Sequence, residues 1–573
     1  MTDTAAATAT TGHVFSGEGL DLGTLTLMLE ALDDFVGAAL TPERQLELDH
    51  EDVCPEDTVR AMCSDELGVQ LVFVPEAYGG MGGGAFDSYR VCETMARHDI
   101  GLATAVFATF LGSDPILVGA TEEQRAHWLG RIAEEGIVFA YGATEPDAGS
   151  DLGAMTTTAV PITDEDGAIT HYKLNGRKQW ISNGSIADAT TILALAPGGP
   201  TWFVVPRGTE GFSAATPEDK HGIRLSNTAA LFLDDVVVPV ENLIGGVEGK
   251  GLVQAQQVFG YTRVMVAAFG MGGGWEALQR AIDYSQNREQ GGSVLAEKQG
   301  YTHKLIVPHV VRLEAARAFL EETSARLDAG EGTNGALNTE GAIAKLMASE
   351  FGNAAAEAAI QAHGGYGFTR PYVVEKVKRD VRITTIYEGT SEILEMTIAR
   401  DRWQAHLKSR GGHYRQAAAG LRALHAANPG VGADAAALAN DCLAAVLDAC
   451  QAGRLTRNQH VLFRLGELIA WAETAGAAAR RAAAAANGTA HEKTDKRFGA
   501  PALAAIARVF ARDAALKVAD DGLRWVVGAA DGTSAQAASL AASLPMDAVR
   551  AAQSGLLADM NTVAAVIYGK DQS

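Results

Sequence analysis

The segment QAHGGYGFTRPYVVEKVKRDVRITTIYEGTSEI, residues 361–393, decides how this chain is interpreted. Near its end a lone carboxylate, Glu388, lies between Tyr387 and the Gly389–Thr390 pair, after a basic run and before a strongly helical stretch. An acid flanked by residues that break a regular pattern is either a solvated loop residue or part of a site. Residues 386–396 alone do not distinguish these two interpretations, so the rest of the chain has to be considered.

Composition limits the classes of protein to consider. The chain has 573 residues, of which 47% are hydrophobic and 20% charged, as expected for a soluble globular protein of two to four domains. No apolar run reaches the 18 or more residues of a membrane span. The N-terminal MTDTAAATATTG has neither the basic and apolar regions of a signal peptide nor any Arg, so we expect a disordered tail. The five cysteines lack CxxC spacing, which favours reduced thiols, a cytoplasmic location and no metal site.

Charge is unevenly distributed along the chain. Residues 1–400 carry 28 Lys and Arg against 55 Asp and Glu, whereas residues 401–573 carry 19 against 15. The acidic body repels nucleic acid. The mildly basic C-terminal part could dock on the body, on a partner or peripherally on a membrane, or it could be an ordinary helical domain with scattered charges.

The hydrophobic period changes three times. It is helical from Leu25 to about Arg131, strand-like from about Val138, helical again after Gly251, and Ala-rich and helical from Trp403 onward. The predicted divisions are a disordered tail at 1–20, a helical domain at 21–136, a β-domain at 137–247, a helical bundle at 248–402 and an extra helical domain at 403–573.

Two local motifs refine this interpretation. The Asn-Gly of ITHYKLNGRKQWIS, residues 169–182, predicts a hairpin between two strands. GMGGGWE, residues 270–276, mimics a dinucleotide-binding loop but follows no strand, so we interpret its glycines as a helix-packing feature.

The residues that could carry chemistry are small, hydroxylated and aromatic. HExxH, P-loop, GxSxG and spaced Cys/His patterns do not occur. YGATEPDAGSD, residues 141–151, instead places Thr144 and Ser150 among small residues, so that backbone amides can approach an anion or a polar ring. QWISNG places Trp180 where its indole could cover a flat cofactor. Each motif alone is weak, because Gly-rich turns are common and a strand Trp is usually a core residue.

In combination these motifs resemble the acyl-CoA dehydrogenase family. YGATEPDAGSDLGAM, KLNGRKQWISNG and the 361–393 segment occur in that order on a background of helices, sheet and helices, and the resemblance covers about residues 25–403. Residues 460–509 are similar to the extra helical domain of the very-long-chain branch. The implied fold class is α+β: an N-terminal helical domain, a middle β-barrel or sandwich, a four-helix bundle and an extra helical domain.

The resemblance implies a role for Glu388. In the family the Glu of the YEGT motif is the base that removes the α-proton of an acyl-CoA thioester while the β-hydrogen leaves as hydride to flavin N5, forming the trans-2-enoyl-CoA. An apolar pocket raises the pKa of such a base. The backbone N–H of the same Glu and a flavin hydroxyl hold the thioester carbonyl. Some members carry the base on a bundle helix instead, at the position of Thr262, which cannot act as a base.

The resemblance also implies the cofactor and substrate residues. The implied FAD residues are Tyr141, Ala143, Thr144, Ser150, Trp180, Ser182, Thr390, Ser391 and Glu392, with Arg288, Gln290, Gln299, Gln361, Gly364 and Gly365 reaching the FAD of a neighbouring subunit. The implied substrate residues are Ser150, Ala103, Phe107, Phe259, Arg263 and Gly389. Gly260 departs from members that have an Asp there to bind the pantetheine. Sharing of FAD across a two-fold interface implies a homodimer or a dimer of dimers, and the very-long-chain-like extension favours the dimer.

One helix predicts the acyl preference. In IGLATAVFATFLGSDPI, residues 100–116, alignment with the family places Ala103 and Phe107 at positions that face the pocket. Long-chain members have small residues there, so Phe107 predicts short, branched or cyclic acyl groups. The alternative is that Phe107 points into a neighbouring helix as part of the core.

Three functions from different classes follow. The leading hypothesis is an FAD-dependent acyl-CoA dehydrogenase that passes electrons to an electron-transfer flavoprotein. An acyl-CoA oxidase-like flavoenzyme that uses O2 is the nearest alternative. A nucleic-acid-binding flavoprotein of the alkylation-response branch is disfavoured, because the C-terminal part lacks a run of Lys and Arg. Sequence alone names neither the acyl group nor the pathway.

Overall fold

The computed structural model describes residues 19–332, 335–529 and 534–570. The predicted tail of residues 1–20 lies outside these residues except for its last two. Leu20 is buried and its backbone N–H donates to Asp87 Oδ2 at 2.8 Å. The prediction of a tail to residue 20 is therefore wrong by two residues, because Leu20 packs into the core.

The first helical layer ends where the β-strands begin. Its helices are α1 (Leu22–Ala39), α2 (Pro42–Glu51), α3 (Glu56–Met62), α4 (Val69–Phe73), α5 (Ala85–His98), α6 (Ile100–Gly119) and α7 (Glu122–Glu135), with the short η1 (Glu76–Tyr78) between α4 and α5. Local caps set the ends of α7: Thr121 and Gln124 form a capping box, and Gly136 stops the helix at φ +64°. By length and composition α6 could span a membrane, but 89% of its most hydrophobic window is buried inside the protein.

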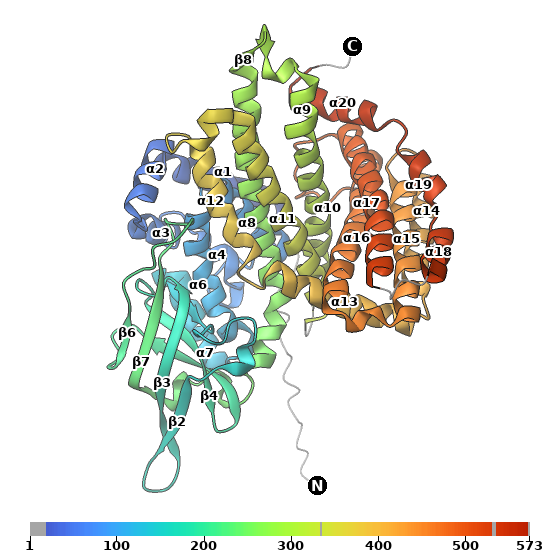
Figure 1. Cartoon of the computed structure of the whole chain (residues 1–573). Helices are drawn as coiled ribbons and strands as arrows, with labels where there is room; N and C mark the ends of the chain where they lie inside the picture. The colour runs from blue at the N-terminus through green and yellow to red at the C-terminus, as the bar shows by residue number, and fades with distance from the viewer. Residues whose placement is uncertain (1–18, 333–334, 530–533, 571–573) are drawn as a thin grey trace.

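The middle of the chain forms a seven-stranded sheet. Its strands are β1 (Phe139–Gly142), β2 (Thr158–Thr163), β3 (Ile169–Ser182), β4 (Ala189–Ala196), β5 (Gly199–Pro206), β6 (Phe212–Ala214) and β7 (Thr228–Pro239). Their order is β1-β4-β2-β3-β7-β6, with β5 paired to β4. Figure 1 shows these strands gathered at one end of the molecule, below the first helical layer. Because α6 packs on β1, the first helical layer contacts the sheet at this strand.

The predicted Asn-Gly hairpin is wrong. β3 runs without a turn through Asn175 and Gly176, and the register of its pairing with β7 shifts there. Asn175 Nδ2 donates to Asp235 Oδ1 at 2.9 Å, the Asp235 N–H donates to Asn175 Oδ1 at 2.9 Å, and Asp235 has φ +50°. The pair therefore forms a bulge against β7, because long-range pairing overrides the local turn preference.

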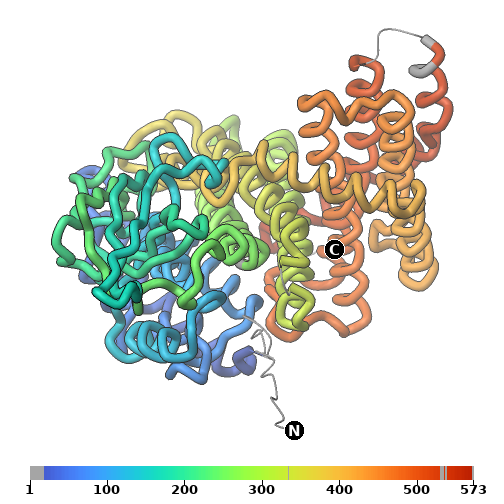
Figure 2. The backbone as a smooth tube through the Cα atoms, turned by 90° about the horizontal axis from the view of Figure 1, so that it is seen from below, coloured from blue at the N-terminus to red at the C-terminus, as the bar shows by residue number. Residues whose placement is uncertain are grey.

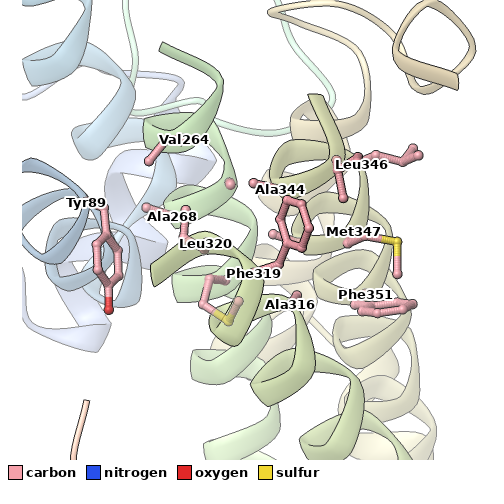
Figure 3. Packing of buried hydrophobic residues seen from close by; sticks show 14 of the residues in the cluster. Tyr89, Val264, Ala268, Ala316, Phe319, Leu320, Ala344, Leu346, Met347 and Phe351 are labelled. Carbon is pink, nitrogen blue, oxygen red and sulfur yellow. The ribbon is translucent and has the colours of Figure 1, made fainter. Parts of the chain in front are cut away.

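The central bundle is built on two long helices. Its elements are α8 (Gly251–Asn287), β8 (Glu289–Gln290), β9 (Ser293–Val294), α9 (Gln299–Leu305), α10 (Val307–Asp328), α11 (Asn338–His363), α12 (Val373–Val381) and α13 (Ser391–Lys408), with short 3-10 turns η3 (Val240–Asn242), η4 (Ile244–Gly246), η5 (Leu295–Glu297), η7 (Gly364–Phe368) and η8 (Arg382–Thr385). Figure 3 shows the buried side chains of α5, α8, α10 and α11 that fill the space between them. A Cβ on Gly352 would lie 2.1 Å from the Gly270 carbonyl oxygen, so glycine lets α8 and α11 approach closely. This confirms that the glycines of GMGGGWE serve packing.

The C-terminal helices form a second body against the bundle. They are α14 (Gly412–Ala427), α15 (Ala433–Gly453), α16 (Gln459–Asn487), α17 (Ala500–Ala529), α18 (Ser534–Ser543), α19 (Met546–Ala552) and α20 (Leu556–Ile567), with η9 (Leu455–Arg457) before α16. Figure 2 shows them on the far side of the bundle from the sheet. Helix α13 continues across residue 402, so no break in secondary structure marks the predicted boundary there. The order helices, sheet, bundle and further helices confirms the predicted fold class.

Candidate active site

Glu388 lies in a loop with an uncommon backbone conformation. The loop joins η8 to α13, and two consecutive residues, Glu388 and Gly389, have φ of +52° and +94°. A left-handed conformation at a residue with a side chain costs about 1–3 kcal/mol and persists only where surrounding contacts impose it. In the described part of the chain no group accepts a hydrogen bond from the Glu388 N–H. That N–H is therefore free to donate to a ligand.

The Glu388 carboxylate points at α8. Thr262 Oγ1 donates to Glu388 Oε2 at 3.2 Å. Burial raises the pKa of Glu388 above its ordinary value, and the Arg263 charge, the Thr262 hydroxyl and the Lys345 charge oppose this rise. A carboxylate that is poised in this way can accept a proton near neutral pH.

Two cations approach the Glu388 loop from α8 and α11. The buried Arg263 lies over the Phe259 ring at 4.9 Å and donates through Nη1 to the Asn338 carbonyl at 3.3 Å. Burial lowers the pKa of Arg263 to about 10, so it stays charged at neutral pH. Lys345 Nζ donates to the Gly389 carbonyl at 2.7 Å. The charges of Arg263 and Lys345 therefore favour the ionised form of the Glu388 carboxyl.

The end of β1 also lies near Glu388. Tyr141 packs on Trp202 with ring centroids 4.8 Å apart, and burial raises the pKa of Tyr141 further in the field of Glu388. The Gln179 N–H donates to the Thr144 carbonyl at 3.0 Å, which brings the end of β3 against the end of β1. Next to Gln179, Trp180 is 61% exposed. Thr144 and Trp180 thus lie close together where the ends of β1 and β3 meet, and Tyr141 lies at the end of β1.

A buried ion pair holds the loop that follows β1. Glu145 accepts from Lys178 Nζ at 2.8 Å and from the backbone N–H of Thr156 at 2.6 Å and of Thr157 at 3.0 Å. Burial alone would raise the pKa of Glu145, but these bonds lower it to about 2. Lys178 Nζ also donates to the carbonyl of the buried Ala143 at 3.2 Å. The loop that presents exposed Ser150 is therefore anchored at its base.

The predicted cofactor residues after Glu388 lie at the start of α13. Thr390 caps α13 by accepting from the Ile393 N–H at 3.4 Å. Ser391 Oγ donates to Glu350 Oε1 at 2.5 Å, whereas Glu392 is exposed. Ser182 ends β3, paired with Thr228. Contact of Thr390, Ser391, Glu392 and Ser182 with a flavin stays a prediction.

The predicted cofactor residues fall into two groups at opposite ends of α8. Tyr141, Ala143, Thr144, Ser150, Trp180 and Ser182 lie at the sheet, whereas Arg288, Gln290, Gln299, Gln361, Gly364 and Gly365 lie around β8, α9 and η7 (Figure 1). Because α8 has 37 residues, its ends are about 55 Å apart. One chain cannot place both groups on the same dinucleotide.

The second group has its own contacts within the chain. The Arg288 guanidinium lies 5.7 Å from the Tyr366 ring centroid, and Gln299 Nε2 donates to Asn561 Oδ1 of α20 at 3.1 Å. Gln290, Gln361, Gly364 and Gly365 are exposed. Gly364 caps α11 at φ +62°. This end of the molecule thus presents polar groups outward.

The predicted acyl-end residues are buried between helices. Ala103 is 0% exposed and Phe107 4%. The Phe107 ring packs edge-on against Phe73 of α4 at 6.3 Å and Phe269 of α8 at 5.7 Å. The ring thus fills the space between α4, α6 and α8. The ring therefore lies in the packing between these helices, and its contact with an acyl chain stays a prediction.

Sequence reasoning missed two buried groups near Glu388. Lys345 stands alone among apolar residues in AIAKLMA, residues 342–348, and a lone buried-face Lys was the available signal. Asp114 of α6 is 3% exposed, its Oδ2 has no hydrogen-bond partner among the described residues, and burial raises its pKa in the field of Glu388. Nothing in the sequence pattern around Asp114 indicated that position.

Comparison with known proteins identifies the domains. Family models described as the acyl-CoA dehydrogenase N-terminal, middle and C-terminal domains match residues 24–136, 140–236 and 249–402. "Acyl-CoA dehydrogenase, short-chain specific" of Megasphaera elsdenii is 35% identical over 374 residues, which cover 64% of this chain and 94% of that protein. "Caffeyl-CoA reductase-Etf complex subunit CarC" of Acetobacterium woodii is 33% identical over 373 residues, covering 64% of this chain and 94% of that one.

One solved structure covers nearly the whole chain. An acyl-CoA dehydrogenase from Bacillus anthracis complexed with FAD superposes with a TM-score of 0.81 at 25% identity, covering 97% of this chain and 96% of that one. Fold and site together define an FAD-dependent oxidoreductase. The chain belongs to the acyl-CoA dehydrogenase family.

The residues present fit a flavin. An exposed indole at Trp180 offers a flat surface, and the neighbouring Thr144 and Ser150 offer hydroxyl donors beside small side chains. FAD is the cofactor of this flavoprotein, and its function is of the acyl-CoA dehydrogenase type.

Proposed function

We propose that the enzyme oxidises an acyl-CoA thioester to the 2-enoyl-CoA, with Glu388 as the base that removes the α-proton. One observation carries this proposal: the Glu388 carboxylate is enclosed between Thr262 and two cations while its own backbone N–H remains free. Bound FAD supplies the acceptor for the hydride that leaves the β-carbon.

The chain's own groups divide the chemistry between them. The Glu388 carboxylate takes the α-proton, and its N–H donates to the thioester carbonyl, where negative charge develops. Gly389 has no side chain to block that approach. Arg263 lies near Gly389, since a Cβ on Gly389 would lie 3.9 Å from Arg263 Nη2, and its charge favours the ionised carboxylate. Tyr141 and Trp180 line the cofactor side.

The test is Glu388→Gln in the holoenzyme. Gln keeps the size of the side chain but cannot accept the proton, so we expect FAD to remain bound while the rate of acyl-CoA oxidation falls about 10²–10⁴-fold. Flavin bleaching by a C4–C16 acyl-CoA panel under anaerobic conditions measures the reductive step. Glu357→Gln, at an exposed Glu on α11 paired with Lys378 at 3.1 Å, is the matched control. Bleaching at near-wild-type rate in the Glu388→Gln enzyme would falsify the assignment.

The electron acceptor is proposed to be an electron-transfer flavoprotein. The name of the Acetobacterium woodii relative, which places that protein in a complex with Etf, supports this. Reoxidation of the reduced enzyme by electron-transfer flavoprotein, measured beside reoxidation by O2, distinguishes the dehydrogenase from the oxidase alternative.

The assembly is proposed to be a homodimer that shares two FAD molecules. Support comes from the separation of the two groups of predicted FAD residues, since the group around β8 and η7 cannot reach the FAD at its own sheet. The C-terminal helices α14–α20 are proposed to match the very-long-chain branch, on the similarity of residues 460–509. The superposition on the Bacillus anthracis enzyme covers these helices as well but does not distinguish the branches. A cytoplasmic location and a peripheral membrane contact through these helices stay predictions.

A further inference from the structure

Lys345 is a buried cation in the apolar stretch of α11 that spans residues 342–348. Its side chain is 0% exposed, and its neighbours on α11, Ala344 and Leu346, are buried too. Burying an ammonium group is costly unless it binds acceptors. Lys345 Nζ donates to the Gly389 carbonyl at 2.7 Å. The helix thus carries a charge toward the backbone of the Glu388 loop.

The hydrogen bond from Lys345 is made to a residue with a left-handed backbone conformation. Glu388 and Gly389 are consecutive left-handed residues at φ +52° and +94°. On the same helix, Glu350 accepts from Ser391 Oγ at 2.5 Å. Helix α11 therefore holds the Gly389 carbonyl in the loop and Ser391 at the start of α13. Without these contacts the loop would relax toward the common right-handed backbone.

The charges around Lys345 come from four elements. Glu388 faces it from the loop, Arg263 from α8, Glu350 from α11 itself and Glu392 from α13. Burial lowers the pKa of Lys345 to about 7, against the pull of Glu388. Below about pH 7 the ammonium form is therefore present, and it opposes the burial that raises the pKa of Glu388. Above that pH the neutral amine can still donate an N–H to Gly389.

Two further titratable groups, on α6 and β1, interact with Glu388. Asp114 of α6 and Tyr141 of β1 both lie within its field, and burial raises the pKa of both, which favours their neutral forms. They add no positive charge. Arg263 and Lys345 are thus the two cations that stabilise the carboxylate, and Lys345 also holds the loop backbone at Gly389.

We propose that Lys345 is the positioning residue for Glu388: its Nζ holds the Glu388–Gly389 backbone in the left-handed conformation, and its charge stabilises the ionised carboxylate. This inference rests on the proposed function, in which Glu388 is the base. Its two parts make separate predictions, because a hydrogen bond acts on geometry and a charge acts on ionisation.

Three variants separate the two parts. Lys345→Met removes both donor and charge, Lys345→Gln keeps a donor without charge, and Lys345→Arg keeps both. Lys378→Met, which removes a half-buried Lys paired with Glu357, is the matched control. Each holoenzyme is assayed for FAD content, for kcat and KM, and for the pH dependence of kcat.

A direct probe of the base is a 3-thiaacyl-CoA. Its β-position is sulfur, so it can lose the α-proton but has no β-hydrogen to transfer. The enolate formed against the flavin is followed by long-wavelength absorbance as pH is varied. The pH at which half of the enzyme holds the enolate is the enolate midpoint, and it reports the basicity of Glu388 without turnover. This midpoint is measurable even in a variant with low kcat.

The expected results are specific to each variant. Lys345→Met lowers kcat at pH 6 about 10–10²-fold, less than loss of the base itself, and moves the enolate midpoint to higher pH with KM little changed. Lys345→Gln recovers part of kcat but keeps the shifted midpoint, whereas Lys345→Arg restores the midpoint. A wild-type midpoint in both the Lys345→Met and the Lys345→Gln enzymes overturns the inference, as does an equal shift in the Lys345→Arg enzyme.

Failure of this inference is distinguishable from failure of the proposed function. If Glu388→Gln forms no enolate and Lys345→Met behaves as wild type, only the role of Lys345 is refuted. If Glu388→Gln forms the enolate normally, the base itself was assigned wrongly. Should Lys345→Met lose FAD, the Gln and Arg variants still decide the question, because both can retain the bond to Gly389.

Discussion

Replacing Arg317 by Met is expected to weaken the contacts of the central bundle with the N-terminal helices on one side and the C-terminal helices on the other. Arg317 of α10 is 0% exposed. It donates to both oxygens of Glu93 on α5, at 2.6 and 2.5 Å, and through Nε to Glu314 Oε1 at 3.0 Å. Glu314 Oε2 in turn accepts from Arg481 Nη1 of α16 at 2.8 Å. One buried guanidinium thus links the N-terminal helices to a network that reaches the C-terminal helices.

The size of the stability loss follows from the buried carboxylate that loses its partner. Removing one partner of a buried ion pair costs about 3–5 kcal/mol, because the remaining charge is buried without compensation. For a cooperative unit of 150–250 residues, each kcal/mol lowers Tm by roughly 2–4 °C, so Arg317→Met should lower Tm by about 6–20 °C. The loss should be much smaller in Arg317→Met combined with Glu93→Met, because two apolar side chains then replace the pair.

The pH dependence adds an independent test. Burial alone would raise the pKa of Glu93, but the Arg317 charge and hydrogen bonds outweigh it and lower that pKa. A carboxyl with a folded pKa below its unfolded value stabilises the fold above the unfolded pKa, and this stability is lost as pH falls through the folded pKa. Without Arg317 the pKa of Glu93 rises instead, so the variant should lose more stability at pH 8 than at pH 5.

Thermal and urea unfolding of the holoenzyme at the two pH values measures both effects. Arg550→Met, at an exposed pair with Asp547, is the surface control and should leave Tm unchanged. A loss below about 1 kcal/mol, or an equal loss at both pH values, would refute the reasoning that a buried uncompensated carboxylate dominates.

Two further predictions concern the acyl group and the assembly. Phe107→Ala should shift the kcat/KM profile toward longer acyl-CoA by at most about 0.8 kcal/mol per added methylene, at a stability cost of about 3–5 kcal/mol. Faster turnover of palmitoyl-CoA than of C4–C8 substrates by the wild type would contradict a ring that closes the pocket. Light scattering should find a homodimer with one FAD per chain, and Arg288→Ala should lower FAD occupancy in that dimer. A monomer with full FAD content would exclude a shared site.

Much of the fold follows from local pattern. The helical period of residues 25–131, the strand-like runs of residues 190–205 and the helical period after Gly251 each depend on neighbours close in the chain, and the structure confirms them. The Asn-Gly of β3 shows where local pattern fails: Asn175 bonds Asp235, 60 residues further along the chain. The local turn preference of Asn-Gly cannot compete with a register imposed by the pairing of a 14-residue strand.

Some residues of the candidate site were predicted from local sequence, whereas others depend on contacts between distant segments. Glu388 and the motif around Tyr141 were predicted because each is a contiguous signature. Lys345 was not, since its meaning depends on the Gly389 carbonyl, 44 residues away. Phe107 was assigned to a helix face, but whether that face meets an acyl chain or Phe73 and Phe269 depends on how α4, α6 and α8 pack.

By itself the sequence determined the family, the cofactor and the order of the helical and β regions, because these depend on period and on motifs read along the chain. Only the tertiary structure decided which charges meet. Arg317 with Glu93 and Lys345 with Gly389 are pairs distant in sequence. It also showed that α8 separates the two groups of residues that the resemblance assigns to FAD. Burial makes such pairs strong, and burial is a property of the packed chain that no single segment carries.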